Sequence, residues 1–312
     1  MNTNAIAARV VFALALTAAA AVRSSEAQTA PPGAGNGRAA TRSALLQVSA
    51  LRTLRNEPGT VILQVGSASR FAEGHVPGAR FVALSDVSTP RREGALILEL
   101  PESAQLERWA RSVGISNDTR RIVVVPDSDT LQSSTRVLFT LAFMGLGDRT
   151  TLLDGGLGAW RAAGAPVETG EAAPLAPSTA ALTIRRDSSL VAVLDEVDAA
   201  TRNASVTIID ARLPQFYNGN GGGYPRPGRI PSAVNVPLSL VSEGGRLRTP
   251  EELRALFASA GVKPGQPVIT YCHIGQQASL LWFVARELGY DVRLFDGSFQ
   301  QWSGSSLPLG SP

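Results

Sequence analysis

The residue of this sequence best suited to covalent chemistry is Cys272, the only cysteine among 312 residues. It follows an apolar run at residues 268–271 and precedes a short segment that contains Gly275, after which a second apolar stretch begins at Leu280. This order predicts a buried strand, a tight loop and a helix. The N–H groups of such a loop, and the positive end of the helix, would converge on the sulfur. We therefore expect a lowered thiol pKa and a reactive thiolate.

The alternative interpretation is structural, since a lone cysteine often serves as a small buried hydrophobe. The position of Cys272, at the end of a strand and just before a helix, favours a nucleophile instead. With no second cysteine, the chain forms no internal disulfide.

Two motifs of the sequence resemble those of the rhodanese sulfurtransferases. Tyr271-Cys272-x-x-Gly275-x-x-Ala278, opening a helix after a strand, is similar to the active-site loop of that family. The segment 295–302, Phe-Asp-Gly-Ser-Phe-Gln-Gln-Trp, is similar to its closing motif. The resemblance runs from about residue 44 to the end of the chain. It implies two homologous domains, with the active loop in the second.

The chain also contains an internal repeat. The turn at residues 74–79 recurs at 228–233, and the Asp-Gly turn at 154–155 recurs at 296–297. Strands alternate with helical patterns in both halves; in the first, a helical pattern begins with Leu45 and Leu46. This alternation predicts an α/β fold with two domains, each a mostly parallel sheet flanked by helices. The predicted domains are residues 44–165 and 184–312, joined by a linker at 166–183 that is rich in Pro, Ala and Thr.

The two halves differ where the chemistry is expected. The first half has Asp127 at the position of Cys272, so the resemblance implies a non-catalytic first domain and a catalytic second one. The second half carries Asp210-Ala211-Arg212 after its early strand. The resemblance implies that Asp210 orders the site and that Arg212 faces an anionic substrate through charge-assisted hydrogen bonds. A salt bridge at the surface or between domains is the alternative for Arg212.

The activity that the resemblance implies is sulfur transfer in two steps. The Cys272 thiolate takes the outer sulfur of a small anionic donor such as thiosulfate, and a thiophilic acceptor such as cyanide or a thiol removes it. No metal and no organic cofactor is required. His273 is either a source of partial positive charge near neutral pH or an exposed loop residue. The backbone amides expected to hold the persulfide are those of His273, Ile274, Gly275, Gln276 and Gln277.

Three other functions remain open. A phosphatase or arsenate reductase would have a longer loop closing on an arginine, but that position is Ala278, and Gln276 and Gln277 carry no charge. A non-enzymatic sulfur carrier would hold the persulfide for a protein partner, which the sequence does not identify. A binding module with an incidental cysteine would have a buried, unreactive thiol. His75 lies in the repeated turn, where a structural role is expected.

The N-terminal residues indicate export. Arg9 precedes an apolar run at 10–22, and small residues follow, so residues 1–27 are predicted to be a signal peptide and residues 28–43 a flexible linker. The mature protein is expected in the periplasm or outside the cell, without stable membrane insertion. The net charge of +3 comes from scattered arginines, with no basic run that would indicate a nucleic-acid partner.

Overall fold

The computed structural model describes Met1 and residues 43–172 and 180–310. The predicted signal peptide and N-terminal linker therefore lie, apart from Met1 and Ser43, outside the described residues, as does the middle of the predicted interdomain linker. The described residues from 43 onward belong to one compact unit. No helix among the described residues has the length and apolar character needed to span a bilayer.

The first half of this unit is an alternation of strands and helices, as the sequence predicts. Its elements are β1 (Leu45–Leu46), α1 (Val48–Leu54), β2 (Thr60–Val65), α2 (Ala68–Glu73), β3 (Arg80–Val82), α3 (Ser103–Ser112), β4 (Arg121–Pro126), α4 (Leu131–Leu141), β5 (Thr150–Leu153) and α5 (Gly156–Ala162).

The second half repeats the alternation and adds a small hairpin. Its elements are β6 (Val191–Ala192), α6 (Leu194–Thr201), β7 (Thr207–Asp210), α7 (Pro214–Tyr217), β8 (Val234–Asn235), β9 (Ser242–Glu243), β10 (Arg246–Leu247), α8 (Pro250–Ser259), β11 (Val268–Tyr271), α9 (Gln276–Glu287), β12 (Val292–Phe295) and α10 (Ser298–Gly304). Helix α8 begins with a capping box in which Thr249 and Glu252 satisfy each other's backbone amides.

The two halves have the same sheet topology, which confirms the predicted duplication. Each sheet has five strands, in the order β1-β5-β4-β2-β3 in the first half and β6-β12-β11-β7-β8 in the second. All strand pairs within both sheets are parallel. The central strands, β4 and β11, occupy equivalent positions in the two sheets. The loop that follows each of them therefore lies at the carboxyl edge of its sheet, where ligands bind in such folds.

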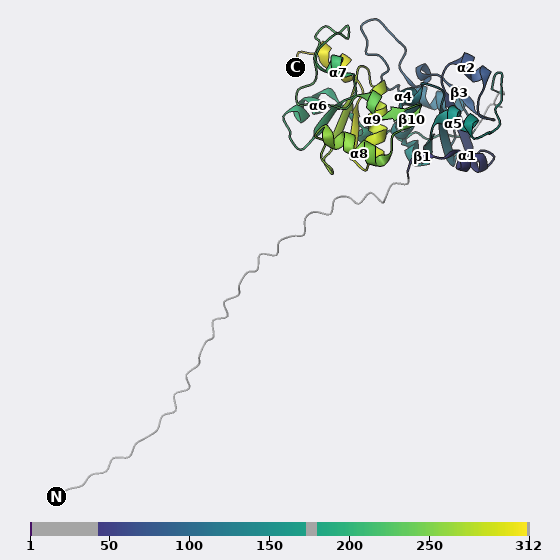
Figure 1. Ribbon diagram of the computed structural model, residues 1–312, viewed down its shortest axis with the longest axis horizontal. Coiled ribbons are helices and arrows are strands. Elements are labelled where there is room, and N and C mark those ends of the chain that lie inside the picture. Colours follow the sequence, from purple (N-terminus) through teal and green to yellow (C-terminus); the bar gives the residue numbers. More distant parts are fainter. Residues whose placement is uncertain (2–42, 173–179, 311–312) are drawn as a thin grey trace. The chain divides into compact units, whose positions relative to one another are not determined.

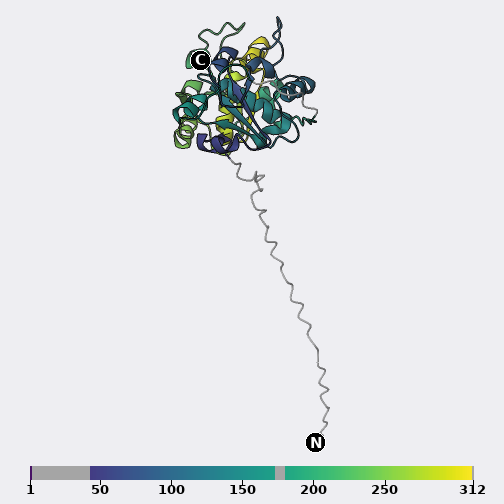
Figure 2. The ribbon, with the colours of Figure 1, turned by 90° about the vertical axis from the view of Figure 1, so that its right-hand side faces the viewer.

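The halves pack on each other through the helices that follow the central strands. Helices α4 and α9 are in direct contact (Figure 1), and Phe139 and Trp282 meet edge to face with ring centroids 4.9 Å apart. One buried apolar cluster contains residues of both halves, including these two rings. The view of Figure 2 has the first half facing the viewer. The interface is therefore a continuous core, which fixes α4 against the helix that begins at the Cys272 loop.

One local prediction is wrong. Leu45 and Leu46 belong to strand β1 rather than to a helix, and the helix starts only at Val48. The two leucines pair in parallel with Leu152 and Leu153 of β5 at the edge of the sheet. Tertiary pairing thus overrides the helical spacing of these side chains, as is common for short segments.

Candidate active site

Cys272 lies directly after β11, the central strand of the second sheet, and α9 begins four residues later at Gln276. Gly275 precedes the helix with a φ of 84°, in the left-handed region that favours glycine. A side chain here would also bring a Cβ to 2.9 Å from the Asp296 carbonyl oxygen. Glycine is therefore needed for the chain to turn this tightly from strand to helix.

The loop directs several amides at the Cys272 sulfur, as the sequence predicts. The donors are the N–H groups of Ile274, Gly275, Gln277 and Ala278. Ala278, in the first turn of α9, is an addition to the amides expected at the sulfur. The amides of His273 and Gln276 stay predictions. The contribution of these residues to substrate binding stays a prediction.

The prediction of a lowered thiol pKa is wrong for this enclosed sulfur. Burial raises the pKa of the Cys272 thiol, and the four amide hydrogen bonds, which lower it, do not fully offset that effect. The Cys272 side chain is fully buried. Burial alone would also suit an incidental cysteine, but four amides converging on one sulfur form an anion-binding cradle, which that interpretation does not predict.

Helix α10 holds the backbone of the loop. The first-turn amides of Phe299 and Gln300 donate to the carbonyl oxygens of Cys272 and His273, at 3.0 Å in both cases. The Cys272 amide donates to the Ser298 hydroxyl at 3.2 Å. These amides have no partner inside their own helix, so the loop and α10 satisfy each other. Ser298 was not among the residues predicted for the site, although it lies in the closing motif.

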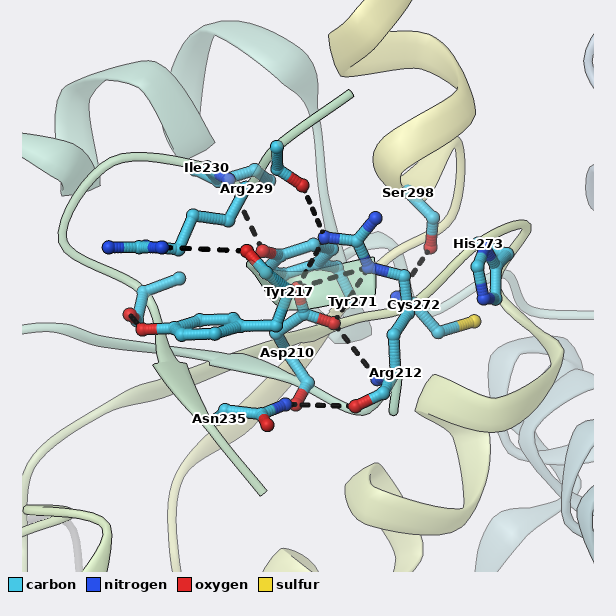
Figure 3. Close-up of polar contacts among 12 residues, drawn as sticks. Asp210, Arg212, Tyr217, Arg229, Ile230, Asn235, Tyr271, Cys272, His273 and Ser298 are labelled. Carbon is cyan, nitrogen blue, oxygen red and sulfur yellow. Dashed lines mark hydrogen bonds and ion pairs between the residues drawn. The ribbon is translucent and has the colours of Figure 1, made fainter. Parts of the chain in front are cut away.

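Arg212 and Asp210 form a buried ion pair (Figure 3). Nε of Arg212 donates to both carboxylate oxygens of Asp210, at 3.0 and 3.1 Å, and Nη2 donates to Oδ2 at 2.7 Å. Nη2 also donates to the Gly228 carbonyl at 2.8 Å. Both side chains are buried, so the pair is neither at the surface nor between domains. Nη1 makes no hydrogen bond within the described part of the chain. Substrate binding by Arg212 stays a prediction.

His273 is surrounded by aromatic side chains that the sequence did not single out. The Tyr224 hydroxyl lies 2.6 Å from Nδ1 of His273, and the two rings are stacked. Phe216 meets the imidazole edge to face, with ring centroids 4.8 Å apart. Tyr224 directly follows the glycine-rich, mostly exposed stretch 219–223, which places this stretch beside the site. Only the juxtaposition of the loop, α7 and this stretch could identify these residues.

Of the two alternatives given for His273, the positive charge near neutral pH is wrong. Burial, together with the positive charge of Arg212, lowers the pKa of His273 to about 4. The imidazole is therefore neutral at pH 7. Burial raises the pKa of Tyr224, so its hydroxyl stays protonated and shares a hydrogen bond with Nδ1 of the neutral imidazole, in a direction set by the tautomer. The aromatic surroundings make this side of the site uncharged.

A pH titration tests this protonation state. We expect the His273 ring signals to titrate with a midpoint near pH 4, measured by NMR and assigned with His273→Gln, since the chain has only two histidines. As the folded pKa lies below the ordinary 6.5, the unfolded chain binds the proton first as pH falls. The stability contribution of neutral His273 is thus complete above pH 6.5 and is lost as pH falls towards 4. A midpoint at 6.5 would contradict the buried, neutral ring.

The equivalent place in the first half carries a carboxylate and no thiol. Asp127 follows β4 as Cys272 follows β11, and its carboxylate accepts from the Ser128 amide at 2.8 Å. His75 is buried against Phe71, with the rings stacked 3.9 Å apart, and its Nδ1 lies 2.9 Å from the Phe71 carbonyl oxygen. These contacts suit the structural role expected of His75. Within residues 43–172 and 180–310, no three His, Cys, Asp or Glu side chains are grouped to hold a metal ion.

Comparisons with known proteins agree with this arrangement. Residues 47–163 and 193–305 each match the family model described as the rhodanese-like domain. SseB of Mycobacterium tuberculosis, provisionally named a thiosulfate sulfurtransferase, is 33% identical over 245 residues, which cover 77% of this chain and 84% of SseB. The thiosulfate sulfurtransferase of Azotobacter vinelandii is 29% identical over 262 residues, covering 83% of this chain and 93% of that protein.

Among solved structures, the comparison with SseA of Escherichia coli, described as a 3-mercaptopyruvate sulfotransferase, gives a TM-score of 0.73 at 25% identity. The alignment covers 82% of this chain and 99% of SseA. The similarity therefore extends over both halves and both sheets.

Proposed function

The chain belongs to the rhodanese family, with two rhodanese-like domains, and on that premise we propose that it is a sulfurtransferase carrying sulfur on Cys272 as a persulfide. The observation that supports this most strongly is the cradle of four amides around the sulfur of the only cysteine. The proposed donor is thiosulfate, and the proposed acceptor is cyanide or a thiol.

The first step loads the sulfur. The Cys272 thiolate attacks the outer sulfur of thiosulfate, a sulfur–sulfur bond forms to the enzyme, and sulfite leaves with the electron pair of the bond that breaks. The product is a cysteine persulfide with a negative terminal sulfur. Amides that are already in place before the reaction can stabilise such an anion without reorganising. The N–H groups of Ile274, Gly275, Gln277 and Ala278 would have this role.

The second step unloads it. Cyanide attacks the terminal sulfur, thiocyanate leaves, and the Cys272 thiolate is restored, so electrons and atoms balance without a redox cofactor. A thiol acceptor takes the same sulfur to give a new persulfide. This is covalent catalysis with a ping-pong pattern. Because the second step needs no other thiol, one cysteine is sufficient.

The alternative phosphatase or arsenate reductase function has less support. A phosphoryl group or arsenate needs a cation to grip its oxygens, and the loop residue where an arginine would be expected is Ala278, whose amide instead faces the sulfur. The adjacent His273 is neutral at pH 7. The compact, uncharged loop is matched to a single sulfur atom.

A sulfur-transfer assay tests the proposal. Purified protein is incubated with thiosulfate and cyanide while thiocyanate is measured, and with thiosulfate alone before intact-mass analysis. We expect turnover and one added sulfur atom per chain. Loading without turnover would instead support a non-enzymatic carrier. If neither thiosulfate nor 3-mercaptopyruvate loads sulfur, the proposed function is wrong.

We also propose that the protein is exported, on the evidence of the charged and apolar residues at 1–27. Cell fractionation with an antibody, combined with N-terminal sequencing of the mature chain, tests this. Full-length protein confined to the cytoplasm would contradict it.

A further inference from the structure

The first domain contributes a buried arginine to the surroundings of the catalytic loop. Arg136 of α4 has no exposed side-chain surface, and its Nη1 lies 2.6 Å from Oδ1 of Asp296 in the second domain. Its Nη2 donates to the carbonyl of Leu98. Leu98 adopts a φ of 64°, which is uncommon for leucine. Among the described residues, Nη1 is ion-paired with Asp296 but makes no hydrogen bond, and Nε has no partner. A buried charge needs its partner to offset the cost of desolvation, so the position of Arg136 depends on Asp296 and on the Leu98 carbonyl.

The partner of Arg136 lies just before the helix that holds the Cys272 backbone. Asp296 lies in the Asp-Gly turn just before α10, and its Oδ2 accepts from the Leu100 amide of the first domain at 2.9 Å. Gln300, in the first turn of α10, accepts from the Ile97 amide at 2.9 Å and donates to the Ala95 carbonyl at 3.2 Å. The start of α10 is therefore fixed on residues 95–100 of the first domain. The same helix start binds the carbonyls of Cys272 and His273.

The other side of the loop is attached to the same first-domain helix. A Cβ on Gly275 would lie 3.1 Å from Nη1 of Arg136, so the guanidinium lies directly against the loop backbone. Gln276 donates to the Ser133 hydroxyl at 2.9 Å, and Ser279 shares a hydrogen bond of 3.0 Å with Thr135. The start of α9 therefore contacts α4, and the start of α10 contacts residues 95–100 of the same domain. In both helices this is the end that faces Cys272.

A second arginine–aspartate pair between the domains shows that this arrangement is specific to the catalytic loop. Arg246 of the second domain pairs at 2.7 Å with Asp154, in the equivalent Asp-Gly turn of the first domain. Its side chain is 53% exposed, whereas that of Arg136 is 0% exposed. The exposed pair lies at the Asp-Gly turn of the first domain, and the buried pair lies at the turn that precedes α10 and the Cys272 loop.

We propose that Arg136 is a positioning residue supplied by the non-catalytic domain, which sets the Cys272 loop through Asp296 and α10. Arg136 does not act on the sulfur itself. It fixes the loop at the start of α9, whose amides surround the sulfur, and the start of α10, which binds the carbonyls of that loop. This inference rests on the proposed sulfur transfer for its effect on rate, but its effect on the loop is independent of that activity.

The test compares Arg136→Met with Arg246→Met, which removes the matched interdomain pair at the inactive loop. At a temperature where both variants are folded by circular dichroism, we expect Arg136→Met to lower kcat by about 10- to 100-fold, since small misplacements have effects of that size. The KM for thiosulfate should change by less than about threefold, because no group that touches the substrate is removed. Arg246→Met should keep kcat within about twofold.

Arg136→Lys separates charge from geometry. It retains the positive charge but not the planar fork that reaches both Asp296 and Leu98, so its kcat should fall between those of wild type and Arg136→Met. If Arg136→Met fails to fold, this variant carries the test alone. Wild-type kcat in Arg136→Lys would overturn the proposal. Where Arg136→Met does fold, a loss of kcat equal to that of Arg246→Met would overturn it as well.

Hydrogen exchange measured by mass spectrometry provides a readout that does not depend on sulfur transfer. Arg136→Met should speed exchange in peptides covering residues 272–279 and 296–300, and Arg246→Met should leave those peptides unchanged. If the wild-type protein transfers no sulfur but the exchange result holds, the proposed function fails and the positioning role stands. Unchanged exchange at residues 272–279 in Arg136→Met would overturn the positioning role whatever the activity.

Discussion

Cys272→Ser is expected to reduce sulfur transfer to the background rate, a loss of at least about 1,000-fold in kcat. The serine hydroxyl fits the same buried cradle, but it is not ionised near neutral pH and forms no persulfide. The measurements are thiocyanate production and intact mass after incubation with thiosulfate. Because this is the only cysteine, neither readout has a background from other thiols.

The control for Cys272→Ser is a variant that alters the equivalent position of the other domain. Asp127 follows β4 in the same way, and Asp127→Asn should retain both loading and turnover. Sulfur loading by Cys272→Ser, or an equal loss of activity in Asp127→Asn, would place the chemistry elsewhere. Circular dichroism of both variants shows whether the fold is retained.

Arg212→Met is expected to lower the free energy of unfolding by about 3–5 kcal/mol, because it leaves the Asp210 carboxylate buried without its partner. Asp210 is 0% exposed and Arg212 only 1%, so little solvent is available to replace the lost interactions. Urea unfolding followed by circular dichroism measures the change. Activity measured on the folded fraction then reports whether Arg212 also acts on the substrate.

The matched control is Arg202→Met. Arg202 forms a similar two-contact pair with Asp198, at 2.9 and 2.7 Å, but on the surface of α6. Exposed pairs of this kind contribute little, so the unfolding midpoint of Arg202→Met should match that of the wild type. Equal midpoints for Arg212→Met and the wild type would show that burial of the Asp210 pair adds nothing to stability.

The fold is largely predictable from the sequence because it depends on periodicity and repetition. Apolar runs mark the central strands β4 and β11, and the repeated glycine and aspartate turns fix the order of the elements around them. Leu45 and Leu46 show the limit of this reasoning. Their spacing fits a helix, and only the pairing with β5 makes them a strand.

The site is predictable only in part. The cradle around Cys272 follows from a strand, a glycine turn and a helix that are adjacent in sequence, so its amides could be anticipated to within one or two residues. The charge of His273 could not be anticipated. It depends on burial of the ring beside Tyr224 and Phe216 and on the positive charge of Arg212, all of which come from other segments.

The sequence by itself determined the duplicated α/β architecture, the place of the only cysteine after the central strand of the second half, and the aspartate at the equivalent place in the first. Each of these follows from residue type and local order. The tertiary structure alone decided which groups share the low-polarity interior around Cys272. It raised the pKa of the Cys272 thiol, kept His273 neutral and brought Arg136 of one domain onto Asp296 of the other. The physical reason is that desolvation and ion pairing depend on distances between segments remote in sequence, which only packing sets.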